Sequence, residues 1–562
     1  MNKHTAALLE QHFDTAFNAP DGLKKLRELI LTLAMQGKLV AQDPSDPPAS
    51  ALLKEIEAEK KRLVKEGKIK APKPLPPVTE EEKPYALPHG WEWTRLGVLA
   101  IVNGGFAFKS SKYSDDGVRV IRISDFDENG FKDDKIVRHP YSNDLIGFSL
   151  EPNNILMAMT GGTVGKSLLV KKIPELMVVN QRVATIKIFE KVAPEFINAL
   201  IRTNLIQSVI HAAKNSTNDN ISMADITGFL VPLPSLPEQH RIVAKIDELM
   251  ARCDALEKLR TAQNEKRLRV HAAAIGQLLN FAEPAQHQRA QAFLADHFGD
   301  LYTVKENVAE LRKAILQLAV MGKLVPQNPN DPPASALLKE IEAEKKRLVK
   351  AGKIKAPKPL PPVTEEEKPY GLPQGWEWVR LGEIGIWKSG STPSRTNSSY
   401  YGGEIPWVKS GEVKQGRIKH TEETITALAL NQCSLSLNPK GAVLVAMYGA
   451  NIGEVGILDI EATTNQAVCA CTTFTAFDER YLLNLIVSLK PYFISQGAGA
   501  AQPNISREKI IATPFPLPPL KEQHRIVVKI DELMALCDSL DQKIDSATAK
   551  QNEMLDALMA QV

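Results

Sequence analysis

The sequence predicts an α+β protein with a pseudo-two-fold internal repeat, in which two mixed α/β domains are separated by long antiparallel coiled-coil helices. Three observations predict this fold. Long blocks of the sequence are duplicated, the C-terminal end carries a heptad pattern, and the two segments between the duplicated blocks match each other poorly. The duplicated blocks therefore indicate a shared frame, and the unmatched segments indicate two variable domains.

The duplication is close to perfect over one block. Asp46–Tyr85 recurs as Asp331–Tyr370, and one of the 40 positions differs, Glu66 against Ala351. A second block begins at Pro232 and returns at Pro516. Recent duplication alone would have left the variable inserts equally alike, so we expect both copies of the frame to face identical partners. The inserts are expected to face different ones.

These boundaries predict five regions. They are an N-terminal helical region with a proline-rich strap over 1–97, a first variable domain over 98–235, a central region of long helix, helices and second strap over 236–382, a second variable domain over 383–519, and a C-terminal coiled-coil helix over 520–562. Short apolar runs predict strands in the variable domains at Val118–Ile123, Ile155–Met159, Glu404–Val408 and Ala442–Met447.

The first region has clear local signals. Ser50 is expected to cap a helix over Ala51–Glu66, with Gly67 as its stop. The proline-rich segment that follows is incompatible with a helix or a central strand and is expected to be extended. Such segments are commonly semi-rigid linkers, but the near-perfect duplication of this one favours a docking role.

The heptad pattern predicts a helix of roughly 50 Å at ~1.5 Å per residue. Its apolar positions are Ile526, Ile530, Leu533, Cys537, Leu540, Ile544, Ala547, Met554 and Leu558, and the polar Gln551 occupies one slot of the seam. The first copy places Arg260, Gln263 and Arg267 on the corresponding seam, which predicts a wetter or differently paired second half. The repeat order also predicts that the C-terminal helix packs beside the N-terminal helices around Leu26–Leu39.

Composition excludes several classes of protein. The formal charge is +3, so no global field indicates a nucleic-acid or membrane partner. No run approaches the ~20 apolar residues of a membrane span, and the first residues lack the apolar core of a signal peptide. The 5 cysteines are odd in number and scattered, which is typical of reduced thiols. We therefore expect a cytoplasmic protein.

Three motifs resemble catalytic or metal sites without completing them. Thr160–Ser167 is one residue from a phosphate-binding loop, but Thr160 stands in place of the first glycine, and the matching stretch in the second insert, Tyr448–Val455, lacks the lysine and serine. Asp46–Ala49 resembles the tetrad of adenine methyltransferases but ends in alanine instead of an aromatic residue. Cys469 and Cys471 have no second ligand pair at zinc spacing. We expect a non-enzyme with no metal or cofactor of its own.

The repeat plan resembles the specificity subunit of type I restriction–modification enzymes, in the subfamily with an extended N-terminal conserved region. The resemblance rests on three sequence features: the helix ends at Gly37–Val40 and Gly322–Val325, the Pro-Leu-Pro segments that precede the long helices, and the first residues of both inserts. The inserts resemble target recognition domains, and the resemblance covers essentially the whole chain.

This resemblance implies a sequence-specific subunit that reads a bipartite, asymmetric site in double-stranded DNA. Two modification (methyltransferase) subunits would dock on the repeated blocks, and restriction (translocase and nuclease) subunits would join them. S-adenosylmethionine, ATP and Mg²⁺ are expected on those partner subunits. The helices would set the spacing of the half-sites, about one helical turn or roughly 34 Å.

Candidate DNA-reading residues are polar side chains at loop positions, chosen because Arg and Lys can bridge guanine, Asn can bridge adenine, and Ser, Thr and many Lys contacts go to phosphate. The candidates are Lys109, Ser110, Lys112, Tyr113, Arg122, Thr163 and Lys166 in the first insert, and Ser391, Thr392, Arg395, Asn397, Tyr400, Lys409, Tyr448 and Asn451 in the second. Asn180–Gln181 and Asn465–Gln466 could equally satisfy backbone groups, and Ser222 with Asp225 resembles a capping box.

Two alternatives remain open from the sequence. A coiled-coil scaffold without a DNA role is favoured by the nearly neutral inserts but leaves their divergence unexplained. A cryptic adenine methyltransferase fusion is disfavoured by the missing motifs.

Overall fold

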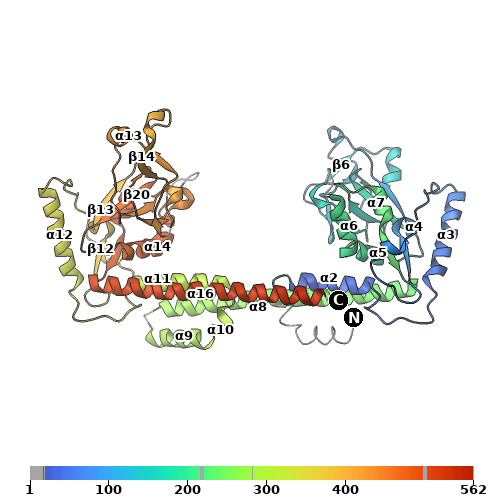
Figure 1. The fold of residues 1–562 in the computed structure, drawn as a ribbon, viewed down its shortest axis with the longest axis horizontal. Helices are drawn as coiled ribbons and strands as arrows, with labels where there is room; N and C mark the ends of the chain where they lie inside the picture. Colours follow the sequence, from blue (N-terminus) through green and yellow to red (C-terminus); the bar gives the residue numbers. More distant parts are fainter. Residues whose placement is uncertain are drawn as a thin grey trace. The chain divides into compact units, whose positions relative to one another are not determined.

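The computed structural model describes residues 17, 19–214, 220–280, 283–414, 416–497 and 503–560. The chain divides into two compact units, each described by itself. Unit 1 is Met1–Gln263 with Ala547–Val562, and unit 2 is Asn264–Ser546. Each unit combines small sheets with short helices and with segments of two long helices (Figure 1). The α+β class predicted from the sequence is confirmed.

Unit 1 is built on a four-stranded sheet in the order β2-β10-β7-β8, a three-stranded sheet β6-β3-β9, and the pairs β1-β11 and β4-β5. Its helices are α2 (Gly22–Met35), α3 (Ala49–Lys65), α4 (Leu96–Leu99), α5 (Pro194–Ile201), α6 (Asn204–Lys214), α7 (Met223–Gly228) and the first part of α8 (Leu236–Leu279). Its strands are β1 (Glu92–Arg95), β2 (Ala100–Gly104), β3 (Val118–Ile121), β4 (Phe126–Asp127), β5 (Gly130–Phe131), β6 (Val137–His139), β7 (Ile155–Ala158), β8 (Ser167–Leu169), β9 (Met177–Val179), β10 (Val183–Ile188) and β11 (Leu230–Leu233).

Unit 2 has sheets β13-β20-β17-β18-β15 and β16-β14-β19 and the pair β12-β21. Its helices are the last part of α8, α9 (Pro284–Asp296), α10 (Phe298–Leu301), α11 (Lys305–Val320), α12 (Ala334–Lys350), α13 (Ala427–Gln432), α14 (Glu479–Ser495), α15 (Arg507–Ala512) and the first part of α16 (Leu520–Met559), whose last part belongs to unit 1. Its strands are β12 (Glu377–Arg380), β13 (Gly385–Ser389), β14 (Tyr401–Val408), β15 (Arg417–Ile418), β16 (Glu423–Ile425), β17 (Val443–Ala446), β18 (Val455–Leu458), β19 (Thr463–Thr464), β20 (Val468–Thr473) and β21 (Pro514–Leu517).

The two units repeat one topology despite their dissimilar inserts. The order β2-β10-β7-β8 corresponds to β13-β20-β17-β18. In both three-stranded sheets the central strand pairs antiparallel with one neighbour and parallel with the other. The two inserts share a pattern of burial although their residues differ. The equivalent internal strands β7 and β17 are buried at every position. All four predicted apolar runs contain or overlap strands, namely β3, β7, β14 and β17.

One buried arginine fixes each proline-rich strap to its own unit. Arg95 is 9% exposed, and its guanidinium donates to the carbonyls of Pro76 (2.8 Å) and Pro77 (3.4 Å) and to both carboxylate oxygens of Glu82 (2.8 Å). Arg380 repeats these bonds in unit 2. The strap is extended, as predicted, but it is a packed part of the unit and not a linker.

A buried tryptophan links each repeated block to its long helix. Trp91 Nε1 donates to Glu238 Oε2 on α8 at 2.9 Å, and Trp376 Nε1 donates to Glu522 Oε2 on α16 at 3.0 Å. The identical blocks therefore contact one another within each unit. This explains part of their sequence identity without any outside partner.

The prediction that Ser50 caps its helix is wrong. α3 begins at Ala49, Pro48 is the N-cap residue, and Ser50 lies inside the first turn. The reason is tertiary: Ala49 N donates to the carbonyl of Gly90 at 2.8 Å, so a neighbouring loop satisfies the first amide in place of a side-chain cap. The predicted stop is confirmed, because Gly67 has a φ of +69° immediately after the helix end.

The heptad seam of α16 holds in its first part. Ile526, Ile530 and Cys537 are buried in the core of unit 2. Ala547, which the pattern places on the seam, is exposed, so the buried part of the seam ends before the polar slot at Gln551. Beyond it, Leu555 and Leu558 belong to a different cluster, in unit 1. The packing surface changes there because the helix passes from one unit to the other.

The last turns of α16 pack beside the N-terminal helix, as predicted. Leu555 and Leu558 share an apolar cluster with Leu29 of α2, and Lys25 pairs with Asp556. The corresponding part of α8 behaves as its polar seam predicted: Gln263 is exposed, and Arg260 donates to the carbonyl of Phe17 at 3.1 Å. Among the described helices, none is both long and apolar enough to cross a membrane.

Candidate nucleic-acid interface

Several loops of unit 1 leave from one edge of its sheets. Gly104 at the end of β2 and Ala158 at the end of β7 both lie beside the start of β10. β3 and β9 run parallel and end at the same edge, where Asn180 N donates to Ile121 O at 2.9 Å. The loops that leave these strand ends span 105–117, 122–125, 159–166 and 180–182. We treat them as the candidate interface of unit 1.

The same edge exists in unit 2. Ala446 at the end of β17 lies opposite Val468 at the start of β20, and Asn465 N donates to Val408 O at 3.0 Å. The loops that leave this edge span 390–400, 409–412, 447–454 and 465–467. Equivalent strand ends thus present different loop sequences in the two units.

Among the candidate residues of unit 1, those after β2 include the most available cations. Lys109, Ser110 and Lys112 are exposed on a short 3₁₀ turn, and neither lysine forms an ion pair with any described residue. Tyr113 is half-buried against Phe108, with ring centroids 6.4 Å apart. This turn can bring two ammonium groups and a hydroxyl to a phosphate backbone.

The remaining candidates of unit 1 are more constrained. Arg122 donates to both carboxylate oxygens of Asp125 at 2.8 Å, and these bonds raise the pKa of the guanidinium. The Thr163 hydroxyl is buried without a hydrogen-bond partner among the residues that the structure covers. Lys166 is half-buried at the end of the same turn. Arg122 can reach a base only by leaving Asp125.

Two candidates of unit 2 belong to one charged cluster. Arg395 pairs with Glu423 at 2.6 Å and stacks over the rings of Tyr401 (4.6 Å) and Trp407 (5.1 Å). Lys409 pairs with Glu422 at 2.8 Å and with Glu423 at 3.0 Å. Arg395 and Lys409 lower the pKa of Glu423 to about 2, and each has its own pKa raised by these bonds. Both cations are held in fixed positions.

The other candidates of unit 2 make local bonds. The Ser391 carbonyl accepts from Trp407 Nε1 at 3.2 Å, and the Thr392 hydroxyl donates to Gln466. Asn397 caps a 3₁₀ turn through Ser399 N, and Tyr400 OH donates to Gln432 on α13 at 3.1 Å. The last two, Tyr448 and Asn451, are half-buried on the 447–454 loop.

The asparagine pairs and the capping-box motif make local contacts with the backbone. Asn180 and Asn465 each accept from a backbone amide two residues on, and Ser222 with Asp225 forms the capping box of α7. The loop starting at Thr160 leads into strand β8 instead of a helix, so it lacks the helix N-terminus on which a phosphate-binding loop depends.

The remaining look-alike motifs are also structural. Asp46 bonds Ser235 and Arg241 beneath the start of α3, while Ala49 is fully buried. Cys469 and Cys471 lie inside the buried strand β20, and burial raises the pKa of Cys469 to about 12. Within the described ranges, no three His, Cys, Asp or Glu side chains are grouped as metal ligands.

Sequence reasoning missed Glu422 and Glu423, which hold the cations of unit 2. They lie 13 to 28 positions from Lys409 and Arg395. No local pattern connects residues at such separations, because the strand pair β14-β16 brings them together.

Comparison with known proteins identifies the family. A family model described as the type I restriction modification DNA specificity domain matches residues 88–265 and 373–548. The chain is 34% identical over 572 residues to the type I restriction enzyme EcoAI specificity subunit of Escherichia coli, covering 96% of this chain and 93% of that protein. It is 33% identical over 578 residues to the EcoEI specificity subunit of the same organism, with the same coverage.

Among solved structures, the HsdS subunit from Thermoanaerobacter tengcongensis matches with a TM-score of 0.43 and 20% identity, over 85% of this chain and 98% of that one. The two family-model matches and the full-length relatives are decisive: this chain belongs to the type I restriction–modification DNA specificity subunits.

Proposed function

We propose that this specificity subunit reads a bipartite, asymmetric site in double-stranded DNA, one half-site by the loops of each unit. The observation that carries the proposal is the pair of equivalent sheet edges with different loops. A common edge gives both units the same approach to a major groove. Different side chains then read different base edges, since each base pair presents a distinct pattern of donors and acceptors there.

The available cations support two kinds of contact. Lys109 and Lys112, exposed and without ion pairs among the described residues, suit phosphates and would position the duplex. Arg395 lies over two aromatic rings and already gives both of its terminal nitrogens to Glu423, so it can form a bidentate contact with a base only after leaving that carboxylate. In this proposal, unit 1 relies more on backbone contacts at these positions and unit 2 more on oriented donors.

The subunit acts within a complex. In this proposal, modification subunits methylate adenines using S-adenosylmethionine, and restriction subunits supply ATP-dependent translocation and cleavage with Mg²⁺. Membership of the specificity-subunit family supports these partners and cofactors. The chain itself contributes recognition and docking, and the long helices α8 and α16 set the gap between the half-sites.

Exchanging one insert tests this function directly. Residues 98–231 are replaced by the corresponding segment of another specificity subunit, and the modification subunit is co-expressed. Sequencing of methylated adenines should show one half of the site changed and the other unchanged. A change in both halves, or in neither, would contradict the assignment of one unit to one half-site.

The helices are tested separately. Inserting one heptad near Leu256 and one near Leu540 adds ~10 Å while keeping the seam in phase. The gap between methylated half-sites should lengthen by about three base pairs at ~3.4 Å each. An unchanged gap in a complex that still methylates would show that the helices do not set it.

A further inference from the structure

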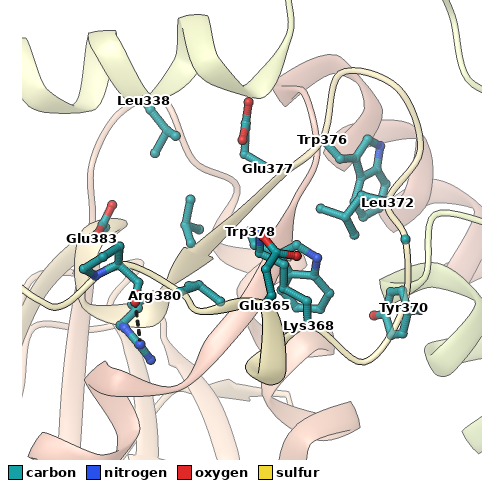
Figure 2. A pocket seen from close by; sticks show the side chains of 14 residues that line it. Leu338, Glu365, Lys368, Tyr370, Leu372, Trp376, Glu377, Trp378, Arg380 and Glu383 are labelled. Atoms are coloured by element: carbon teal, nitrogen blue, oxygen red, sulfur yellow. Dashed lines mark hydrogen bonds and ion pairs between the residues drawn. The ribbon is translucent and has the colours of Figure 1, made fainter.

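A continuous groove follows α12 in unit 2, between the helix and the strap. At one end, a pocket of about 680 Å³ is lined by the aromatic residues Tyr370, Trp376 and Trp378, and the carboxylates of Glu365, Glu377 and Glu383 also line it (Figure 2). At the other end, a pocket of about 560 Å³ has apolar walls that include Val349 and Leu360. Its rim carries Lys345 and Lys346, which pair with Glu342, and also Lys350 and Lys358, which form no ion pair with any described residue. Glu383 and α12 line both pockets, so one groove has an aromatic end and a basic end.

The basic end carries positive charge that the unit does not neutralise. The exposed cations of this run are Lys346, Arg347, Lys350, Lys353, Lys355 and Lys358. The last four form no ion pair with any described residue. In a chain whose net charge is +3, such a concentration makes a local positive field that attracts an anionic group.

The surface is duplicated where folding does not require it. α3 and α12 have the same 17-residue sequence, but each buries three side chains, Leu52 among them in α3 and Leu337 in α12. Packing explains the identity of buried positions and leaves the identity of exposed ones unexplained. The one substitution in the block, Glu66 against Ala351, removes from unit 2 the carboxylate that pairs with Lys68 in unit 1. A partner protein that binds the same surface once on each unit accounts for the repeated exposed charges.

The groove lies at the end of the unit away from the reading loops. Glu344 of α12 accepts from Thr475 N at 3.0 Å and from its hydroxyl at 2.6 Å. Thr475 follows the carboxyl end of β20, whereas the reading loops leave the other end, at Val468. Six residues of strand separate the two ends by ~20 Å. The positive field is therefore directed at something other than the duplex beneath those loops.

We propose that this groove and its copy in unit 1 each dock an acidic segment of the modification subunit. An apolar side chain of that segment fills the aromatic end, and its carboxylates face the lysines. The inference rests on the proposed function, because a methyltransferase that acts on a recognised half-site must be held to the domain that reads it. α12 and the strap suit this purpose, since Glu344 and Arg380 fix them to that domain.

The test counts modification subunits bound to the full chain by native mass spectrometry. One variant of the chain carries K350E, K353E, K355E and K358E in unit 2. A second variant carries the equivalent substitutions K65E, K68E, K70E and K73E in unit 1. The wild-type chain should bind two modification subunits, each one-sided variant one, and the combined variant none. Lysine-to-arginine substitutions at the same positions keep the charge and should retain two.

A second readout separates the possible occupants. Because these lysines are exposed, the variants should keep the thermal unfolding of the wild-type chain, and their affinity for a duplex carrying the site should stay within about twofold. Retention of two modification subunits by both one-sided variants overturns the inference. So does a tenfold loss of DNA affinity with two modification subunits retained, which would assign the groove to the DNA backbone. A wild-type chain that binds no modification subunit contradicts the proposed function itself.

Discussion

The two units share a frame and differ at their reading edges. Arg95 and Arg380 hold equivalent straps with equivalent bonds. At the reading edge, Lys109 of unit 1 is exposed and has no ion pair within the described chain, while Lys409 of unit 2 is held by two glutamates. The difference teaches that duplication preserved the geometry that orients the loops, while the charges on those loops diverged.

The frame itself differs at two buried sites. Glu522 has both oxygens bonded, to Trp376 and to Gln327 (2.8 Å), whereas Glu238 Oε1 is buried with no partner in the part of unit 1 that the structure covers. In unit 2, His271 Nε2 bonds Tyr302 OH at 3.0 Å. By alignment of the repeats, the equivalent positions of unit 1 are Leu555 and Phe17, in an apolar cluster.

Removing the strap arginines should produce the largest effect. R380A removes the buried donor of the carbonyls of Pro361, Pro362 and Ala512 and releases the partly exposed Glu367, and we expect a cost of about 1 kcal/mol for each lost hydrogen bond to a carbonyl. The loss should be local: amide hydrogen exchange should rise over 356–367 and stay unchanged over the strap of unit 1. R95A should give the mirror result. Equal deprotection of both straps by one variant would show that the two frames are not independent.

The buried polar pair of unit 2 should be exchangeable for the apolar pair of unit 1. Y302F leaves His271 without its partner and should cost about 1–3 kcal/mol, whereas H271L combined with Y302F should be close to neutral. L555H, which places a polar ring in the apolar cluster, should cost about 2–3 kcal/mol. Denaturant unfolding of the wild type, H271L, Y302F and the double variant gives the coupling energy between His271 and Tyr302. Simple additivity of H271L and Y302F would contradict a direct pairing.

The two buried glutamates should respond oppositely to substitution. Burial raises the pKa of Glu238 above 4.5, so the folded state holds that proton more tightly. Its contribution is fully present below the unfolded pKa and is lost as pH rises through the raised value. E238Q should therefore match the wild type at low pH and exceed it by about 1 kcal/mol at neutral pH, while E522Q should cost about 1–2 kcal/mol. Unfolding midpoints between pH 4 and 8 measure both.

The smallest effect is expected at the reading edge of unit 1. K109A with K112A should weaken DNA binding uniformly across sequences and reduce the slope of log affinity against log salt by about 2. K409A should instead change base preference in one half-site, because Lys409 supports the position of Glu423 and so of Arg395. Affinity titrations at several salt concentrations test this difference. The same change in the slope of log affinity against log salt for K109A/K112A and for K409A would contradict it.

Local patterns predicted the elements that depend on neighbours in sequence. The repeat, the helix stop at Gly67 and the extended strap all follow from spacing and residue type. The start of α3 did not, because Gly90, distant in sequence, satisfies its first amide. The exposure of Ala547 was not predicted either. A heptad pattern identifies an apolar face of a helix, but it does not identify the surface against which that face packs.

The sequence by itself determined the repeat, the α+β class and the family, because blocks of identical residues and apolar periodicity survive without any knowledge of contacts. Only the tertiary structure decided which cations are available. Arg122, Arg395 and Lys409 look alike in the sequence as loop cations, yet each is held by carboxylates, while Lys109 and Lys112 are not paired among the described residues. Glu423 reaches Arg395 and Lys409 because strand pairing brings them together, and strand pairing is a property of the folded chain. Asp125 lies three residues from Arg122, so that pair is local in the sequence.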